Sequence, residues 1–275
     1  FFLLFPVSCS LMPDMRYALA VEYAGHAFCG FQSQPSRCGV QDALERAIGA
    51  IAGHPVTVSA AGRTDAGVHA VSQIVHFDTE ALRPDGAWVR GVNAHLPAAA
   101  AVLWACAVDP AFHARFAATA RHYTYLLLNR AERPGLCAGR AGWYHRPLDV
   151  EAMRAGAAHL AGTHDFSAFR AAECQAKSPV KTLSCGEIAA QPPFIRFDFS
   201  ANAFLHHMVR NIVGALVYIG AGRQPPDWIA TLLAARDRTL AAPTFAADGL
   251  YLAGADYDAR FGLPPTVRGV AAALP

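Results

Sequence analysis

The segment AGRTDAGVHA, residues 61–70, places a cationic, a hydroxyl and a carboxylate side chain in consecutive positions. Gly62 and Gly67 bracket the three, and glycine permits backbone angles that other residues rarely adopt, so a tight exposed loop is expected after a strand. Asp65 would then project from a rigid support. Arg63 is too close along the chain to pair with it, but a distant arginine could hold it ionised. The alternative is a turn aspartate that caps its own backbone.

A second segment whose residues could take part in catalysis or binding is ANAFLHHMVRNIVGALVYIG, residues 201–220. Its apolar residues recur at three- and four-residue intervals, which predicts a helix over 205–222. His206 and Arg210 are four residues apart on a different stripe, and a cation in so apolar a helix needs a carboxylate or phosphate partner. The neighbours His206 and His207 could suggest a metal site. Adjacent helix positions point in different directions, however, and no third ligand accompanies them, so helix-surface or core histidines are predicted.

A third segment, FHARFAATARHYTYLLLN, residues 112–129, combines arginines with tyrosines. Its strand-like alternation predicts that Arg121, Tyr123 and Tyr125 share one face, with Arg115 in the same run. A nucleobase could stack on such a ring while an arginine holds its phosphate. Half-buried strand tyrosines are the ordinary alternative.

The segment HDFSAFRAAECQAKSPVKT, residues 164–182, adds further positive charge. Arg170, Lys177 and Lys181 fall in a predicted loop together with two phenylalanines. This pattern is typical of a segment that contacts phosphates. A solvated basic loop would have the same composition.

The composition is that of a globular protein, since 53% of the 275 residues are hydrophobic and 16% are charged. A formal net charge of +2 does not by itself indicate a nucleic-acid partner. Only Lys177 and Lys181 among the 23 basic residues are lysines, so arginine dominates, and its planar fork suits phosphates and stacked bases. GC-rich coding would give the same bias.

Cysteines and apolar runs bear on location. The seven scattered cysteines include no CxxC pair and predict neither a disulfide framework nor a zinc site, so a reducing cytoplasm is expected. The opening run FFLLFPVSCSL lacks a basic start and is too short to span a bilayer, so we expect an extension, with folding beginning near Met12 or Met15. No other run predicts a membrane span. The seven cysteines are Cys9, Cys29, Cys38, Cys106, Cys137, Cys174 and Cys185.

Several catalytic motifs are absent from the sequence. It contains no GxxxxGK[ST] phosphate loop, no GxGxxG that opens a helix after a strand, no GxSxG elbow and no cysteine nucleophile with a clear motif. Reactions driven by a nucleotide cofactor and redox reactions are therefore disfavoured. Twelve histidines could suggest a metal-dependent hydrolase, which chelators would inhibit.

The elements that would position these segments recur in two sets. Strands are predicted at 16–23, 56–61, 72–79, 101–108, 119–129, 179–190, 193–201 and 249–257, and helices at 40–53, 84–94, 148–161, 205–222 and 226–236. We therefore predict an α+β fold of two halves. The predicted units are an extension over 1–14, expected to be disordered, an N-terminal α+β half over 15–130 that carries the Asp65 loop, a connection over 131–146, a C-terminal α+β half over 147–265 and a tail over 266–275.

An ordered set of motifs resembles the TruA family of tRNA pseudouridine synthases. The resemblance extends from about Met15 to Tyr257, and the motifs stand in family order. They are FCGFQSQP (28–35), VQDALERA (40–47), GRTDAGVHA (62–70), FHARFAATARHYTY (112–125), GTHDFSAFRA (162–171), CQAKSPVKT (174–182), FLHHMVRNIVG (204–214) and GLYL (249–252).

The resemblance implies a fold and an activity. The fold is the pseudouridine synthase fold: two similar α+β halves share a central, mostly antiparallel sheet with helices on its outer face and a basic cleft between the halves. The activity is isomerisation of uridine to pseudouridine at positions 38, 39 and 40 of the tRNA anticodon stem-loop, without a metal or organic cofactor. The family acts as a homodimer on tRNA.

The resemblance also implies roles for individual residues. Asp65 matches the catalytic aspartate, Arg210 its arginine partner, and Tyr123 the tyrosine that stacks on the flipped-out base and could remove a proton. Leu250 matches the apolar residue that closes over the base. Arg63 is our candidate for holding the flipped backbone or stabilising the vacated site. Candidate phosphate contacts are Arg121, Arg170, Lys177 and Lys181.

Two departures from the family pattern lie outside the predicted catalytic trio. Ala24 stands where the family usually carries an aspartate, and the run 96–102 lacks an acid that is common after its Leu-Pro. We expect these two departures to affect local loop contacts or the positioning of tRNA. Two other functions remain open: a catalytically silent protein that binds or folds tRNA on the same scaffold, and a pseudouridine synthase that acts on another RNA site.

Overall fold

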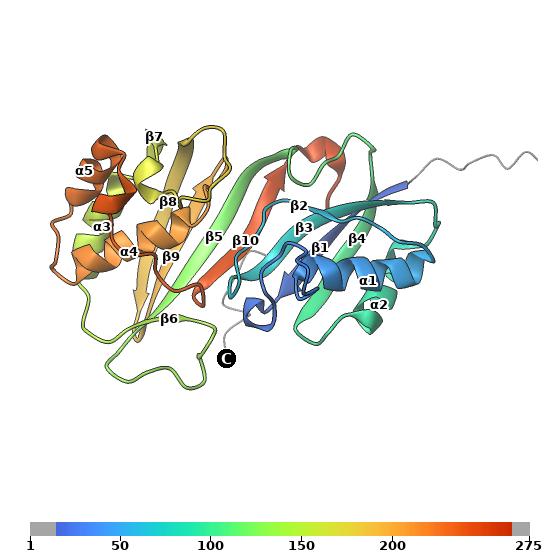
Figure 1. Ribbon diagram of the computed structural model, residues 1–275, viewed down its shortest axis with the longest axis horizontal. Coiled ribbons are helices and arrows are strands. Elements are labelled where there is room, and N and C mark those ends of the chain that lie inside the picture. Colours follow the sequence, from blue (N-terminus) through green and yellow to red (C-terminus); the bar gives the residue numbers. More distant parts are fainter. Residues whose placement is uncertain (1–14, 266–275) are drawn as a thin grey trace, which may run out of the picture.

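A computed structural model describes residues 15–265 of the chain, and its centre is one continuous sheet of ten strands (Figure 1). The strand order is β4-β1-β3-β10-β5-β9-β8-β7, with β2 paired to β3 and β6 paired to β5. Most neighbours are antiparallel, while β10 with β3 and β6 with β5 are parallel. The predicted α+β class with a shared, mostly antiparallel sheet is therefore confirmed. The predicted extension and tail lie outside the described residues.

The strands follow the hydrophobic alternation of the sequence closely. Those of the first half are β1 (Met15–Tyr23), β2 (Ser59–Ala60), β3 (His69–Thr79), β4 (Ala100–Val108) and β5 (Ala118–Asn129). Those of the second half are β6 (Gly142–Tyr144), β7 (Gly162–Asp165), β8 (Val180–Gln191), β9 (Phe194–Ala201) and β10 (Leu250–Tyr257). The short strands β6 and β7 were not predicted, because three or four residues carry too little periodicity to be recognised.

Within residues 15–265, five α-helices pack beside the sheet in two groups (Figure 1). The first group, α1 (Val40–Ala52) and α2 (Asp85–His95), lies beside β1 to β4, and the second, α3 (Val150–Ala158), α4 (Met208–Gly220) and α5 (Trp228–Ala235), lies beside β7 to β9. Helix α1 ends at Gly53, whose φ of 80° gives the left-handed cap that glycine favours. Helix α4 begins three residues later than the predicted start at residue 205, and this difference decides the geometry of the site below.

The last strand joins the two halves. β10 runs parallel to β3 of the first half and antiparallel to β5, and β5 in turn pairs with β9 of the second half. In Figure 1 the long strands β5 and β10 cross the middle of the molecule side by side. One hydrophobic cluster extends through both halves and includes Leu19, Tyr125, Phe197 and Leu216. The junction between the halves is therefore part of the core.

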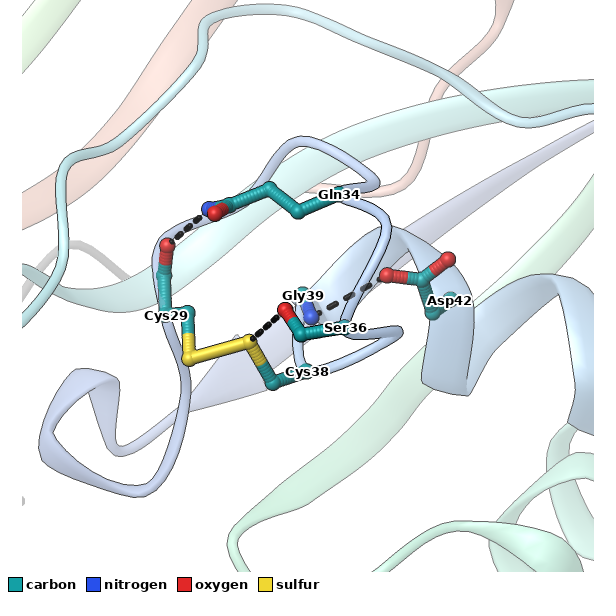
Figure 2. The surroundings of a disulfide bond; sticks show 6 residues. All are labelled: Cys29, Gln34, Ser36, Cys38, Gly39 and Asp42. Atoms are coloured by element: carbon teal, nitrogen blue, oxygen red, sulfur yellow. Dashed lines mark hydrogen bonds between the residues drawn. A yellow bond between two sulfur atoms is a disulfide. The ribbon is translucent and has the colours of Figure 1, made fainter.

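The prediction of no disulfide is wrong for one pair of cysteines. Cys29 and Cys38 form a disulfide across a loop (Figure 2). The Cys29 N–H also donates to the Cys38 carbonyl at 3.0 Å. The pair was not recognised because a nine-residue separation outside a CxxC motif says nothing about proximity. Cys106, Cys137 and Cys174 are free thiols. Among residues 15–265, no helix has the length and apolar character needed to cross a bilayer.

Candidate active site

The loop that carries Asp65 connects β2 to β3. Gly67 has a φ of +83°, as the glycine-flanked sequence predicts, whereas Gly62 does not adopt a left-handed angle. A Cβ on Gly62 would instead lie 3.8 Å from the Tyr123 hydroxyl. The Val68 N–H donates to the Asp65 carbonyl at 3.1 Å and closes the turn. The carboxylate faces away from this turn and meets partners from the second half of the chain.

A second loop, residues 24–31, supports the Asp65 loop from behind. The Phe31 N–H donates to the Thr64 carbonyl at 2.9 Å, and the Tyr23 and Thr64 hydroxyls share a buried hydrogen bond of 2.7 Å. Gly30 has a φ of +96°, and a Cβ there would lie 3.1 Å from the Thr64 carbonyl oxygen. The backbone of residues 64–66 is therefore fixed by close packing and hydrogen bonds, so that Asp65 projects from a rigid support.

Arg210 is the distant arginine that pairs with Asp65. Its Nη1 donates to Asp65 Oδ2 at 3.0 Å, while its Nε donates to the Phe245 carbonyl at 2.9 Å. The Arg210 and Asp65 side chains are 16% and 26% exposed, so the ion pair is largely shielded from water. The guanidinium thus connects the carboxylate to a fixed backbone carbonyl. One nitrogen reaches the carboxylate, rather than the two of a bidentate pair.

Both histidines ahead of α4 also contact Asp65, contrary to the prediction of surface or core histidines. His206 Nε2 lies 3.2 Å from Asp65 Oδ1, and His207 Nε2 lies 3.2 Å from Asp65 Oδ2. The two residues precede the helix, and His207 has a left-handed φ of 61°. Because of this conformation the adjacent rings lie together, with centroids 4.0 Å apart. The prediction failed because it assumed helical geometry at both positions.

The carboxylate therefore has three nitrogen partners. Asp65, His206 and His207 offer donor atoms within 4.8 Å of one another, a spacing that one metal ion could span. Arg210 already places a cation on Oδ2, and a dication beside it would be repelled, so the arrangement fits a hydrogen-bonded carboxylate better than a metal centre. Burial lowers the pKa of His207, an effect that the Asp65 charge partly opposes. A lowered pKa favours the neutral imidazole near neutral pH.

Tyr123 of β5 borders the same site. Its ring is 9% exposed and meets Phe204 edge to face, with centroids 5.0 Å apart. Burial raises the pKa of Tyr123 far above its usual range, and the charges of Tyr23 and Asp65 raise it further. A phenol so affected stays protonated at physiological pH. The Tyr123 hydroxyl borders the Asp65 loop, since a Cβ on Gly62 would lie 3.8 Å from it.

Leu250 begins β10 and lies next to the tyrosine strand. It pairs with Tyr125, while Leu252 pairs with Tyr123. Leu250 is 6% exposed and belongs to the same hydrophobic cluster as Tyr123. The Tyr125 hydroxyl donates to the Ala246 carbonyl at 2.9 Å, which ties β5 to the segment that precedes β10. Leu250 and Leu252 therefore provide apolar side chains on the strand next to Tyr125 and Tyr123.

Three of the four predicted phosphate contacts are engaged within the protein. Arg121 donates to the carbonyls of Ala61, Ala118, Asn202 and Arg115. Arg170 donates to the carbonyls of Cys174 and Ala176, and Lys181 Nζ to those of Ser178 and Val180. A phosphate contact would require these groups to exchange a carbonyl partner. Arg121 in particular fastens the loop before Asp65 to two other segments.

The remaining predicted binding residues are exposed. Arg63 lies two residues before Asp65, and Lys177 lies in the basic segment that precedes β8. Arg115 and Phe116 are exposed as well, and the Arg115 guanidinium lies over the Phe116 ring at 5.7 Å from its centroid. Phe116 was not predicted as a binding residue. The pattern that could have indicated it is an aromatic residue directly after an arginine and just before a polar strand. These side chains are exposed, so a ligand can reach them.

Known proteins similar to this chain have one activity in their names. The sequence profile described as tRNA pseudouridine synthase matches residues 19–117 and 157–258. The chain is 63% identical over 250 residues to tRNA pseudouridine synthase A of Thiobacillus denitrificans, which covers 91% of the chain and 96% of the relative. It is 61% identical over 254 residues to the protein of the same name from Methylobacillus flagellatus, and this match covers 92% of the chain and 97% of the relative. The chain is 58% identical over 255 residues to tRNA pseudouridine synthase A of Burkholderia ambifaria, and the match covers 93% of the chain and 94% of the relative.

Proposed function

This chain belongs to the tRNA pseudouridine synthase family and isomerises uridine to pseudouridine in tRNA, and from that premise we propose that Asp65 is its nucleophile. The single observation that carries the proposal is the Asp65 carboxylate, held 3.0 Å from the Arg210 guanidinium at the end of a rigid loop. An arginine partner keeps the carboxylate ionised and oriented, as a nucleophile requires.

The isomerisation needs one group that attacks and later leaves. The bond from uracil N1 to ribose C1′ breaks, the base turns, a bond from C5 to C1′ forms, the C5 proton is lost and N1 gains a proton. The Asp65 carboxylate can form a covalent bond to the sugar or the base and then be released unchanged, so no cofactor is consumed. Arg210 stabilises the carboxylate each time it is regenerated.

We assign Tyr123 to stacking on the flipped-out base. The residue is largely buried, and its hydroxyl borders the Asp65 loop at Gly62. The same hydroxyl is our candidate for removing the C5 proton late in the reaction. Leu250, which pairs with Tyr125 two residues along β5 from Tyr123, is our candidate for the apolar residue that closes over the base. Arg63, exposed two residues before Asp65, is our candidate for holding the backbone of the extruded nucleotide or stabilising the vacated site. Stacking and this contact would offset the few kcal/mol that unstacking a base costs.

We further propose the target positions, the assembly and the compartment. The targets are uridines 38, 39 and 40 of the anticodon stem-loop, and the functional unit is a homodimer with a basic cleft in each subunit that receives tRNA. The ordered family motifs support both. A tRNA substrate supports a cytoplasmic location. Light scattering of the purified chain with and without tRNA tests the dimer.

The experiment that tests the nucleophile compares three proteins on one unmodified tRNA transcript that contains uridines in the anticodon arm. Wild type should form pseudouridine at positions 38 to 40, mapped base by base. Asp65→Ala should bind tRNA with a Kd within threefold of wild type and form none. Asp227→Ala, which removes a carboxylate that is 88% exposed, is the matched control and should retain full activity. Conversion by Asp65→Ala would rule out the assignment, and tRNA binding by wild type without conversion would favour a silent binder or another RNA site.

A further inference from the structure

The two oxygens of the Asp65 carboxylate are not equivalent. Oδ2 accepts a hydrogen bond from Arg210 Nη1 at 3.0 Å and has His207 Nε2 in contact at 3.2 Å, whereas Oδ1 has His206 Nε2 within hydrogen-bond distance at 3.2 Å. The side chains on Oδ2 are 16% and 26% exposed, and His206 is 39% exposed. Oδ2 is therefore held from the protein side, while the partner of Oδ1 lies nearer to solvent, from which the RNA must approach.

The backbone at His207 indicates that this arrangement is built for the site. A non-glycine residue at φ 61° is uncommon, although histidine is among the residue types enriched there, and such outliers concentrate at functional sites. The outlier bends the chain just before α4, so that both rings reach one carboxylate. The His206 N–H also contacts Cys174 Sγ at 3.4 Å, which fixes the bend to the neighbouring segment.

We propose that His207 is a positioning residue that holds Oδ2 throughout the reaction, and that His206 occupies Oδ1 only until the uridine displaces it, which makes Oδ1 the attacking oxygen. This inference rests on the proposed role of Asp65. It separates two histidines that the sequence presents as equals. His207 orients the nucleophile together with Arg210, and His206 competes with the substrate.

Single-turnover rates of pseudouridine formation and separate tRNA Kd values test the two roles. His207→Asn keeps a residue that tolerates a left-handed backbone but is too short to reach Oδ2, so its rate should fall at least tenfold while the Kd stays within threefold. His207→Gln can place an amide N–H near the position of the imidazole Nε2 and should recover most of the rate. His206→Leu should raise the rate about threefold, because the ground-state partner of Oδ1 is gone.

The control is His95→Leu, an exposed position at the end of α2, and it should match wild type. A wild-type rate for His207→Asn, or a loss found only in its Kd, would overturn the role of His207. A tenfold loss for His206→Leu would show that the two histidines act alike. Wild type reports separately on the proposed function, because a failed isomerase would give no product in any of these proteins.

A second observation, independent of the histidines, concerns the disulfide. Cys29 is exposed and Cys38 is half-buried, and the bond joins the two ends of the loop 29–38 (Figure 2). The residue after Cys29 is Gly30, whose Cβ position lies within 3.4 Å of the backbone of residues 64 to 66. The next residue, Phe31, donates to Thr64. The disulfide thus anchors the segment that supports the nucleophile loop.

We infer that the Cys29–Cys38 pair is a reversible thiol switch that tunes turnover. In the cytoplasm, the compartment proposed above, disulfides are usually transient and often redox-sensing. Oxidised glutathione would form the bond: the Cys38 thiolate attacks it and releases one glutathione, and the Cys29 thiolate then displaces the second, so two thiols are oxidised as one disulfide is reduced. The Ser36 hydroxyl, 2.9 Å from Cys38 Sγ, can donate to that thiolate (Figure 2).

Wild type equilibrated in reduced or oxidised glutathione tests the switch, with mass spectrometry to confirm the state of the bond. The reduced form should show a single-turnover rate at least threefold lower, because the support of Thr64 loosens. The double variant Cys29→Ser, Cys38→Ser should give one rate under both conditions, and Cys106→Ser should respond as wild type does. Equal wild-type rates in the two states, failure of the bond to form, or a response that persists in the double variant would overturn the switch.

Discussion

Replacing Arg210 by Lys retains the charge beside Asp65 but removes the geometry. Arg210 uses Nη1 for Asp65 and Nε for the Phe245 carbonyl, and a lysine ammonium is a single point that cannot reach both with the same orientation. At 3.0 Å the gross Coulomb attraction is about 5.5 kcal/mol with an effective dielectric constant of about 20. Lysine keeps much of that attraction, so the expected loss is that of one charge-assisted hydrogen bond, about 1.5–3 kcal/mol.

If that bond orients the nucleophile in the transition state, the rate should fall by about 10- to 160-fold. The assay is the single-turnover rate of pseudouridine formation at saturating enzyme, with the tRNA Kd measured separately by filter binding. Arg210→Leu should be slower than Arg210→Lys, because it also leaves the shielded carboxylate without its cation. Arg154→Lys, at an exposed i,i+3 pair with Glu151, is the control and should stay within twofold of wild type.

Two results would refute this reasoning. An Arg210→Lys rate within threefold of wild type would mean that charge alone suffices and that the link to Phe245 has no role. A loss confined to the Kd would mean that Arg210 binds tRNA instead of orienting Asp65. Melting temperatures of the variants should be compared with wild type, because α4 is largely buried.

Three further predictions concern stability and tRNA binding. Arg121→Ala should lower the free energy of unfolding by about 2–4 kcal/mol in urea titrations, because four carbonyls lose a charged donor, and its tRNA binding should keep the wild-type salt dependence. Lys177→Ala should instead fold normally and reduce the slope of log Kd against log salt concentration by about one. Burial lowers the pKa of His76 to about 4, with help from His113 and Arg16, so the folded state resists protonation that the unfolded chain accepts below about 6.5. Stability should therefore be complete above pH 6.5 and decline by up to about 3 kcal/mol as the pH falls to 4, and His76→Gln should flatten this dependence in denaturation curves measured from pH 4 to 8.

The sequence alone determined most elements of the fold, because hydrophobic periodicity is a local property. The alternation in residues 16–23 and the helical spacing in residues 40–53 gave elements whose ends differ from the observed ones by one residue. The Asp65 loop was predictable for the same reason, since glycine has no Cβ and readily adopts the left-handed angle that Gly67 shows. The need of Arg210 for an anionic partner also followed from its apolar surroundings.

Only the tertiary structure decided which groups meet. Asp65 and Arg210 lie 145 positions apart in the chain, and their contact depends on the way α4 packs against the shared sheet. The insertion of β10 between β3 and β5 likewise results from strand pairing across the whole molecule. The left-handed turn at His207 and the proximity of Cys29 to Cys38 have no periodic signal, because each is imposed by the packing of surrounding segments. Local patterns therefore specified the elements and the candidate nucleophile, and long-range packing selected the partners of that nucleophile.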